Sequence, residues 1–359
     1  MGMQKSDGMN YAPKGKYAPV CGKGDFRVGV IGLDHGHIFG MCNGLVEAGA
    51  ELMGVYDPDP VKIANFRKSF PDAKAVSSEK AILEDQSVHL VATAAVPSDR
   101  CDLGLRVMDH GKDYFSDKPP FTTLNQIAAA RKKVADTNKK YAVYYSERLH
   151  VEAAVFTETL IADGAIGRVV QVIGMGPHRI SLPQRPEWFF RKEKFGGILV
   201  DLGCHQIEQF LFYSGAKDAR VLSSKVANYK FKQYPELEDF GDATLLADNG
   251  ATNYFRVDWL TPDGLGVWGD GRMFILGTDG YIEMRKYIDV ARSKDGDQVF
   301  LVDHKGEQHF CVTGQVGFPF FGRLILDCLN RTTAAYDQEM FFKAAELAVI
   351  AEQNATRIE

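Results

Sequence analysis

Residues 28–37 read VGVIGLDHGH, and this stretch decides the fold of the N-terminal half of the chain. A short apolar run, typical of a buried strand, leads through glycines into a helical pattern. In a dinucleotide-binding fold such a turn presents backbone N–H groups and a helix N-terminus to a pyrophosphate. The match to G-x-G-x-x-G is imperfect, because Gly32 fills the first position while Asp34 and His37 stand at the second and third.

The turn alone leaves two interpretations open. In one, the backbone from Gly32 to His37 binds a pyrophosphate, and Gly36 allows its close approach. In the other, the segment is a tight strand-to-helix turn with Asp34 as the helix N-cap. A carboxylate at Asp34 would repel a pyrophosphate unless it points away or is neutralised by His35 or His37.

Around this stretch, short apolar runs alternate with helical patterns, which predicts a doubly wound parallel sheet of the Rossmann type. The expected strands are residues 27–31, 51–56, 88–93, 113–115 and 141–144. The expected helices are residues 38–47, 60–69, 98–110 and 124–138. The ligand crevice of such a fold lies at the carboxyl ends of the strands.

The alternation of strand and helix patterns ends after about residue 145. A helix expected at 151–162 and a strand at 168–175 are followed by several strands without intervening helices, at 252–259, 273–276, 281–284 and 298–302. This pattern predicts a C-terminal α/β domain with a large open, mostly antiparallel sheet, closed by a helix at 338–354. We therefore expect an arm at 1–25, a dinucleotide-binding domain at 26–145, and a substrate-binding and oligomerisation domain at 146–359. The final helix is expected to pack back on the first domain.

Length and composition agree with two globular domains. The chain has 359 residues and a net charge of −5, so nothing in its overall balance indicates a partner nucleic acid or an anionic membrane. Its six cysteines form no C-x-x-C pair, and no apolar stretch has the length of a membrane span. We expect a soluble protein of the cytoplasm without a signal peptide.

The second expected strand ends in Tyr56-Asp57-Pro58, 25 residues after the first glycine of the turn. In dinucleotide-binding folds a carboxylate near this position binds the adenosine ribose and repels a 2′-phosphate. NAD is therefore expected rather than NADP, although Lys62 or Arg67 would soften that preference. The alternative is that Asp57 is only a turn residue before a proline.

Two further segments carry residues suited to acid–base chemistry. Lys118 follows the fourth expected strand and precedes Pro119, at the edge where α/β folds bind ligands, so its ammonium can hydrogen-bond an alcohol oxygen. Asp201 and His205 lie one helical turn apart, and a neutral histidine near a helix N-terminus suits a proton acceptor. The alternatives are a solvated surface lysine and a hydrogen-bonded core histidine.

Aromatic and charged residues near these segments suit a sugar or polyol, which has apolar C–H faces and many hydroxyls. The candidate substrate-binding residues are Tyr145, Arg148, His178, Arg179 and Trp188, with the run from Trp268 to Arg272 as a further candidate. Each has an ordinary alternative as a core or turn residue. The histidines at 35, 37, 178 and 205 also raise a metal site, but Lys118 at the expected centre argues against one, and no metal is expected.

Together these segments resemble the Gfo/Idh/MocA family of NAD(P)-dependent oxidoreductases over nearly the whole chain from Phe26 onward. The family's Glu-Lys-Pro motif corresponds to Asp117-Lys118-Pro119, and its Asp-x-x-x-His pair to Asp201 and His205. The resemblance implies hydride transfer between a secondary alcohol of a sugar or polyol and nicotinamide. It implies that Lys118, Asp201 and His205 are catalytic, and that the cofactor-binding residues are Gly32, Asp34, His35, Gly36, His37, Asp57, Pro97, Ser98, Asp117 and Lys118.

The chain departs from the family pattern at three places. Asp34 and His37 replace turn glycines, Asp117 is one methylene shorter than the usual glutamate, and Cys101 stands four residues after Pro97 where a histidine is common. Two other functions share the fold: a regulator that senses NAD or sugar, and redox-assisted glycoside cleavage with retained NAD. An open sheet face is expected to make the protein a homodimer or homotetramer.

Overall fold

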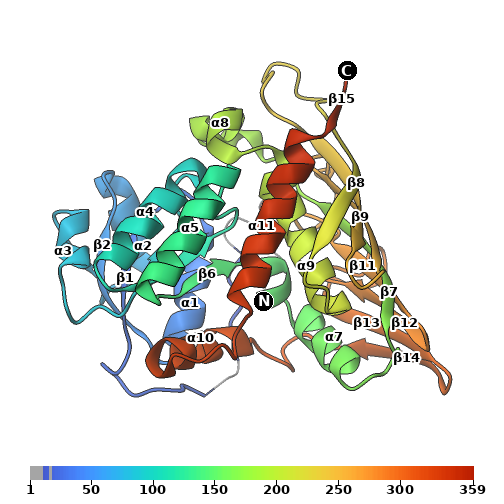
Figure 1. Cartoon of the computed structure of the whole chain (residues 1–359), viewed down its shortest axis with the longest axis horizontal. Coiled ribbons are helices and arrows are strands. Elements are labelled where there is room, and N and C mark those ends of the chain that lie inside the picture. The colour runs from blue at the N-terminus through green and yellow to red at the C-terminus, as the bar shows by residue number, and fades with distance from the viewer. Residues whose placement is uncertain (1–10, 16–17) are drawn as a thin grey trace. The chain divides into compact units, whose positions relative to one another are not determined.

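The segment after residue 26 folds as a six-stranded parallel sheet with the strand order β3-β2-β1-β4-β5-β6 in a computed structural model that describes residues 11–15 and 18–359 (Figure 1). Its strands are β1 (Arg27–Ile31), β2 (Glu51–Tyr56), β3 (Lys74–Ala75), β4 (Leu90–Thr93), β5 (Asp113–Asp117) and β6 (Tyr141–Tyr144). This is the Rossmann order. The order reverses between β1 and β4, so the ligand crevice is expected outside the carboxyl ends of those two strands.

Five helices follow the first five strands, as the parallel pairing requires. They are α1 (His37–Glu47), α2 (Pro60–Ser69), α3 (Glu79–Leu83), α4 (Pro97–Asp109) and α5 (Leu124–Thr137). Local sequence explains their ends: Asp59 caps α2 ahead of a proline, and Thr123 and Gln126 form a capping box at α5. The expected alternation of strands and helices is confirmed, with each end within a few residues of its expected place.

A helix that we did not predict, α10 (Pro319–Asn330), packs against α1 in the same unit. The contact is close because α1 has a glycine there: a Cβ on Gly44 would lie 2.4 Å from the ring of Phe321. The rings of Phe320 and Phe321 also lie 5.9 and 6.5 Å from that of Phe115 on β5. Burial of these aromatic side chains explains why residues 318–342 fold with the first unit rather than with the expected C-terminal domain.

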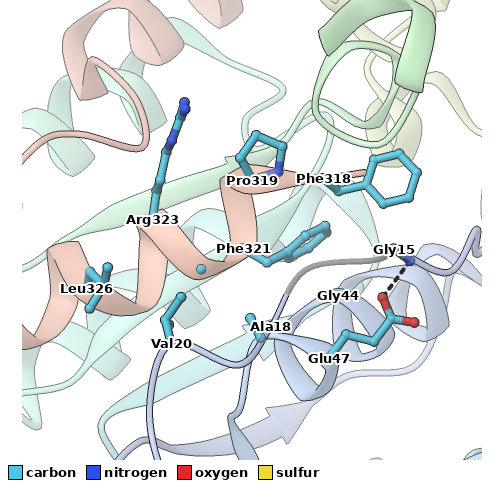
Figure 2. Close-up of a pocket in the computed structure, with 12 residues that line it drawn as sticks. Gly15, Ala18, Val20, Gly44, Glu47, Phe318, Pro319, Phe321, Arg323 and Leu326 are labelled. Carbon is cyan, nitrogen blue, oxygen red and sulfur yellow. Dashed lines mark hydrogen bonds between the residues drawn. The ribbon is translucent and has the colours of Figure 1, made fainter. Parts of the chain in front are cut away.

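The described part of the N-terminal segment also packs on this unit. Val20 N–H donates to the carbonyl of Ala48 at 2.9 Å, and Gly15 N–H donates to Glu47 Oε2 at 2.7 Å. Figure 2 shows a largely apolar pocket between this segment, α1 and α10. The pocket lies by Glu47 at the carboxyl end of α1, whereas the glycine turn lies at the amino end. The pocket is therefore not part of the expected cofactor site.

The second unit comprises residues 145–317 and 343–359 and contains a nine-stranded sheet with the order β14-β13-β12-β11-β7-β10-β9-β8-β15. The strands are β7 (Val169–Pro177), β8 (Ala219–Ala227), β9 (Phe240–Ala247), β10 (Thr252–Asp258), β11 (Arg272–Gly277), β12 (Gly280–Arg285), β13 (Gln298–Asp303), β14 (Gly306–Cys311) and β15 (Thr356–Ile358). Only the β7–β10 and β8–β15 pairs are parallel. The expected mostly antiparallel sheet is therefore confirmed.

Helices cover one face of this sheet (Figure 1). They include α7 (Glu152–Ala162), which packs on β12 and β13, and α9 (Cys204–Ser214), which packs on β7. The remaining helical segments of the unit are α6 (Ser146–Leu149), η1 (Leu182–Gln184), η2 (Glu187–Phe190), α8 (Lys192–Phe195), η3 (Leu199–Gly203) and most of α11 (Gln338–Gln353). The opposite face exposes Tyr254 of β10, Phe274 and Leu276 of β11, and Tyr281 of β12. Among the described residues, no helix is long and apolar enough to cross a membrane.

Candidate functional site

The turn between β1 and α1 requires a glycine at its first position. Gly32 has a φ of +82°, and a Cβ there would lie 2.8 Å from the Cβ of Ala95. Its N–H donates to the carbonyl of Tyr56 at 3.0 Å, and its carbonyl accepts from Ala94 N–H at 3.1 Å. These bonds fix the turn between the neighbouring strands β2 and β4.

The amino end of α1 carries no opposing charge: its N-cap is Gly36, and its first turn has no acidic residue. Asp34 therefore does not cap the helix, which corrects the second interpretation of the turn. The first N–H groups have partners within the turn, since His37 N–H donates to His35 Nδ1 at 3.2 Å and Phe39 N–H donates to the Gly36 carbonyl at 3.1 Å. The dipole of this 11-residue helix still favours a negative charge at its amino end.

The charge of Asp34 is neutralised by a lysine from α2. Lys62 Nζ lies 2.5 Å from Asp34 Oδ1, and their side chains are 36% and 23% exposed. The sequence suggested that His35 or His37 would play this part, but both rings turn towards Asp117 instead. The pairing with Lys62 removes the main electrostatic objection to a pyrophosphate at this turn.

Asp57 is bound to the backbone of its own turn. Its Oδ2 accepts a hydrogen bond from Leu33 N–H at 2.7 Å, and its Oδ1 accepts one from Asp59 N–H at 2.9 Å. The Asp57 side chain is only 1% exposed, and Lys62 Nζ lies 3.9 Å from its Oδ1. The carboxylate that we expected at the ribose therefore also holds together the loops after β1 and β2.

A buried carboxylate organises the carboxyl end of β5. Asp117 Oδ1 lies 2.8 Å from His37 Nδ1 and accepts from Lys118 N–H at 2.7 Å, and its Oδ2 accepts from Arg100 at 3.0 Å. Although burial opposes it, the charges of His37 and Arg100 hold the pKa of Asp117 well below its usual range. Burial, followed by the charge of His37, lowers the pKa of His35 well below its usual value.

His35, His37 and Asp117 form a cluster whose possible metal-ligand atoms lie within 4.8 Å of one another. Arg100 and His37 already contact the two oxygens of the carboxylate. The neighbouring positive charges of Arg100 and Lys118 disfavour an added cation. This cluster is better suited to orienting His37 and the start of the following loop.

Lys118 is 5% exposed at the end of β5, and its peptide bond to Pro119 is cis. Its carbonyl accepts from Arg100, whose guanidinium also binds the carbonyls of Ala95 and Pro119. Arg100 thus joins the loops after β4 and β5 at one edge of the sheet.

The residues at the start of α4 have local partners. Pro97 begins the helix, and the Ser98 hydroxyl donates to Asp99 at 2.7 Å. Cys101, where a histidine is common in the family, donates its thiol to the carbonyl of Gln126. It therefore faces α5 rather than the strand ends.

In the second unit, Asp201 and His205 lie on consecutive helical segments. Asp201 is within the π-helical turn η3, and His205 is the second residue of α9; both side chains are buried. The two residues therefore share one helical path, as expected, although its first turn is π-helical. π-Helical turns occur frequently at functional sites.

Two distant carboxylates hold this turn, and sequence reasoning missed both. Glu238 accepts from Ile198 N–H at 3.0 Å, and Glu352 accepts from Leu199 N–H at 3.0 Å. Lys192 Nζ bridges them, at 2.6 Å from each. Burial and the neighbouring Glu238 raise the pKa of Glu352 to about 7.

A buried charged network lies behind His205, and it was also missed. Gln209 Nε2 donates to the His205 carbonyl, and Lys286 Nζ donates to both Gln209 Oε1 and Glu147 Oε2, each at 2.8 Å. Gln206 Nε2 donates to the same Glu147 oxygen at 2.9 Å. Although burial opposes it, Lys286 and then His205 hold the pKa of Glu147 well below its usual range.

Glycines on β7 make room for this network: a Cβ on Gly174 would lie 2.2 Å from Gln206 Oε1, and a Cβ on Gly176 would lie 2.8 Å from its Nε2. The G-x-G spacing on β7 was the one signal in the sequence that indicated such a close approach.

The expected substrate-binding residues fall into two groups. The Tyr145 ring lies 6.1 Å from that of His205, and the His178 ring lies 5.4 Å from that of Trp259. Arg148, in contrast, is buried in an ion pair with Glu208 and stacks on Phe212. Three further residues have other partners: Arg179 binds loop carbonyls at 262 and 265, Trp188 packs on Phe189, and Trp268 packs on Tyr287.

Comparison with known proteins gives two family matches. Residues 26–145 match the model described as "Oxidoreductase family, NAD-binding Rossmann fold", and residues 157–283 match the "GFO/IDH/MocA C-terminal domain". A crystal structure of a proposed oxidoreductase from Erwinia carotovora atroseptica is 50% identical, with a TM-score of 0.91, and the match covers 93% of this chain and 100% of that one.

Two curated relatives have names that state an activity. D-xylose dehydrogenase from Paenarthrobacter nicotinovorans is 24% identical over 58% of this chain and 53% of that enzyme. The scyllo-inositol 2-dehydrogenase (NAD(+)) of Bacillus subtilis is 24% identical over 65% of this chain and 66% of that enzyme. The chain thus matches between about half and two thirds of the length of these two enzymes.

Proposed function

Because the chain belongs to the Gfo/Idh/MocA family of oxidoreductases, we propose that it oxidises a secondary alcohol of a sugar or polyol and uses NAD as the hydride acceptor. The observation that carries this proposal is the Gly32 turn, which leads into the amino end of α1, where the first turn has no acidic residue, and which has its one carboxylate paired with Lys62. The relatives that bear a substrate in their names act on xylose and on an inositol, which supports the substrate class.

The first unit would hold the cofactor. The N–H groups around Gly36 would bind the pyrophosphate, and Asp57 fixes the loop that carries Leu33. His35 lies on the turn that follows β1, and Pro97 and Ser98 begin α4 after β4, beside the point where the strand order reverses. When bound, the nicotinamide ring accepts the hydride; the residues of the chain bind it, orient it and exclude water.

The proton is handled by residues of this chain. We assign His205 as the base that takes the hydroxyl proton as the C–H bond breaks, and Lys118 as the donor that hydrogen-bonds the same oxygen. Asp201, at the start of the helical path, would bind a neighbouring hydroxyl or orient the histidine. Glu147 lies behind α9, and Lys286 followed by His205 keep its carboxylate ionised, so a fixed negative charge lies on that side of the proposed base.

The substrate pocket would be lined by polar and aromatic side chains of the second unit. Tyr145 lies beside His205, and His178 packs on Trp259, while the Arg185 guanidinium lies over the rings of Trp259 and Phe189. Flat rings and charged donors suit the C–H faces and hydroxyls of a sugar. We assign Arg148 a structural role rather than direct contact with the substrate, because its guanidinium is already paired with Glu208.

The test begins with the nucleotide that co-purifies with the protein, identified by mass and absorbance, followed by a screen of sugars, inositols and glycosides for NADH formation. We expect a polyol or sugar to produce free NADH, and His205→Ala and Lys118→Ala to abolish turnover while nucleotide binding persists. His110→Ala, at the exposed end of α4, is the matched control. Bound NAD without free NADH from any substrate would favour sensing or redox-assisted glycoside cleavage, and absence of nucleotide binding would overturn the proposal.

We also propose that the exposed face of the nine-stranded sheet pairs with a second copy of the chain. Leu276 is 46% exposed and Tyr281 43%, and the two are direct cross-strand partners on β11 and β12. Ile173 of β7 lies between Tyr254 and Phe274 in the strand register. A contiguous apolar surface of this kind on a soluble enzyme is typical of a subunit interface.

A further inference from the structure

Asp57, the residue that we expected to bind the adenosine ribose, is poorly placed to make that contact. Each oxygen of Asp57 already accepts a backbone N–H, one from Leu33 and one from Asp59, and the side chain is 1% exposed. A carboxylate held in this way would lose hydrogen bonds if it turned towards a ligand. Its main contribution is therefore to hold the loops after β1 and β2 together.

A second carboxylate lies at the same edge of the sheet and is accessible. Asp34 stands two residues after Gly32, beyond the carboxyl end of β1, and Lys62 is in the first turn of α2, which follows β2. Their charged atoms are 2.5 Å apart, and Lys62 Nζ is 3.9 Å from Asp57. Lys62 thus lies between two carboxylates where the adenosine ribose of a doubly wound fold binds.

The charges at this place decide which nucleotide it tolerates. Asp34, Asp57 and Asp59 carry three negative charges against one positive charge on Lys62, so a 2′-phosphate would meet net repulsion. A ribose with free hydroxyls instead offers donors to the Asp34 carboxylate, and a hydrogen bond to an ionised acceptor is a strong one. Without Asp34, Lys62 would be free to pair with a phosphate.

We propose that Asp34, more than Asp57, selects NAD over NADP, by engaging Lys62 and by presenting an accessible carboxylate to the ribose. The inference rests on the proposed cofactor function and adds to it a residue that determines cofactor choice. It also explains why a carboxylate stands where the fingerprint has its second glycine. Asp34 is half-exposed, and a half-exposed ion pair contributes little to folding stability, so its replacement leaves the fold intact.

The experiment is a titration of the purified full-length chain with NAD and with NADP. Binding is monitored by calorimetry or by the quenching of tryptophan fluorescence. The variants are Asp34→Asn, Asp57→Asn, Lys62→Met and the double variant Asp34→Asn with Lys62→Met. The matched control is Asp109→Asn, which breaks a comparable exposed pair with Lys133, also 2.5 Å long and in the same unit.

We expect Asp34→Asn to shift the ratio of the two affinities towards NADP by about tenfold or more. The substitution removes the negative charge of Asp34, and with it the hydrogen bond from the ribose to an ionised acceptor. The double variant should lose most of that shift, because Lys62 supplies the contact with the phosphate. Asp57→Asn should weaken the binding of both nucleotides, because Asp57 binds the backbone of both loops, and should shift the ratio of the affinities less than Asp34→Asn does. Asp109→Asn should change the binding of neither nucleotide.

An unchanged ratio in Asp34→Asn, or a shift towards NADP in Asp57→Asn of the same size, would overturn this inference while leaving the proposed function in place. Failure of the unaltered protein to bind either nucleotide would instead overturn the proposed function, and the inference with it. Thermal melting of each variant shows that any loss of binding is not a loss of fold.

Discussion

Arg100 and Asp117 form an ion pair at 3.0 Å in which the two side chains are 1% and 0% exposed. The same guanidinium binds three backbone carbonyls, at residues 95, 118 and 119. A single side chain therefore connects α4 to the loops after β4 and β5, and it does so next to the lysine that we assign to the alcohol oxygen.

Replacement of Arg100 should be strongly destabilising. Arg100→Met leaves the Asp117 carboxylate buried beside two histidines, His35 and His37, but without its guanidinium partner, and loss of one partner of a buried pair costs about 3–5 kcal/mol. Chemical denaturation measures the change. Arg106→Met on the same helix is the control, because Arg106 forms an exposed bidentate pair with Glu79 that contributes about 1 kcal/mol or less. Equal losses in the two variants would contradict this account of Arg100.

Gly32→Ala should abolish nucleotide binding and destabilise the first unit. The φ of +82° disfavours alanine, and the added Cβ would collide with Ala95. Gly111→Ala is the matched control: its φ is +73°, but a Cβ there meets no atom within 4 Å, so only the backbone cost of about 1 kcal/mol applies. A larger drop in melting temperature for Gly111→Ala than for Gly32→Ala would refute the close-contact argument.

The pH dependence of stability should contain a contribution from Asp297. Burial raises its pKa to about 7, above the usual value of 3.8, and its Oδ1 accepts from Ala153 N–H at 2.9 Å. A folded-state pKa above the unfolded value gives stability that is full below about pH 4 and is lost as the pH rises through 7. Asp297→Asn keeps the acceptor oxygen and tolerates the φ of +52°, so it should be more stable than the unaltered chain at pH 8.

The size of that gain is of the order of 3 kcal/mol, given about 1.4 kcal/mol per pKa unit and some relaxation around the buried charge. Urea denaturation at pH 5 and pH 8 measures it. The two proteins should differ much less at pH 5, and a gain that is the same at both pH values would show that Asp297 does not titrate as described.

Lys286→Met should lower turnover more than it raises KM, because Lys286 acts on α9 through Gln209 and Glu147 rather than on the substrate. It leaves the Glu147 carboxylate buried without its cation, so the pH dependence of kcat/KM should also change. The pH profile of kcat/KM distinguishes this from a simple loss of fold. Lys286→Arg, which retains the charge, should restore part of the activity.

Phe274→Asp tests the sheet face as an interface between copies. A charge at the centre of a buried apolar surface should dissociate the oligomer, and sedimentation or light scattering measures the mass. Val61→Asp is the control, since Val61 is apolar and 72% exposed on α2, away from this sheet. Dissociation by both variants, or by neither, would count against the assigned surface.

Patterns among residues that are close in the sequence account for much of what was predicted correctly. The strand-turn-helix at Gly32 and the one-turn spacing of Asp201 and His205 depend on neighbouring residues, so periodicity and turn chemistry reveal them. The packing of α10 on α1 did not follow from any such pattern, because it depends on contact between Gly44 and Phe321, nearly 280 residues apart in the chain. Glu352 binding Leu199 N–H is hidden for the same reason.

The sequence left open whether Asp34 points away or is neutralised by His35 or His37, and it did not indicate Lys62, the partner that the structure shows. Two histidines and a lysine were available, and the sequence does not show which of them a buried carboxylate elsewhere will attract. Asp117 takes His37, which leaves Lys62 to Asp34. Which charged side chains pair with one another depends on their positions in the folded protein.

The chain leaves the first unit after residue 144, returns at 318 and leaves again after 342. A fragment that stops at 144 would therefore lack α10 and would expose the Phe115 side chain and the face of α1 at Gly44 to water. A gene fragment that encodes this unit in full must therefore carry two separate coding segments, one for residues up to 144 and one for residues 318–342.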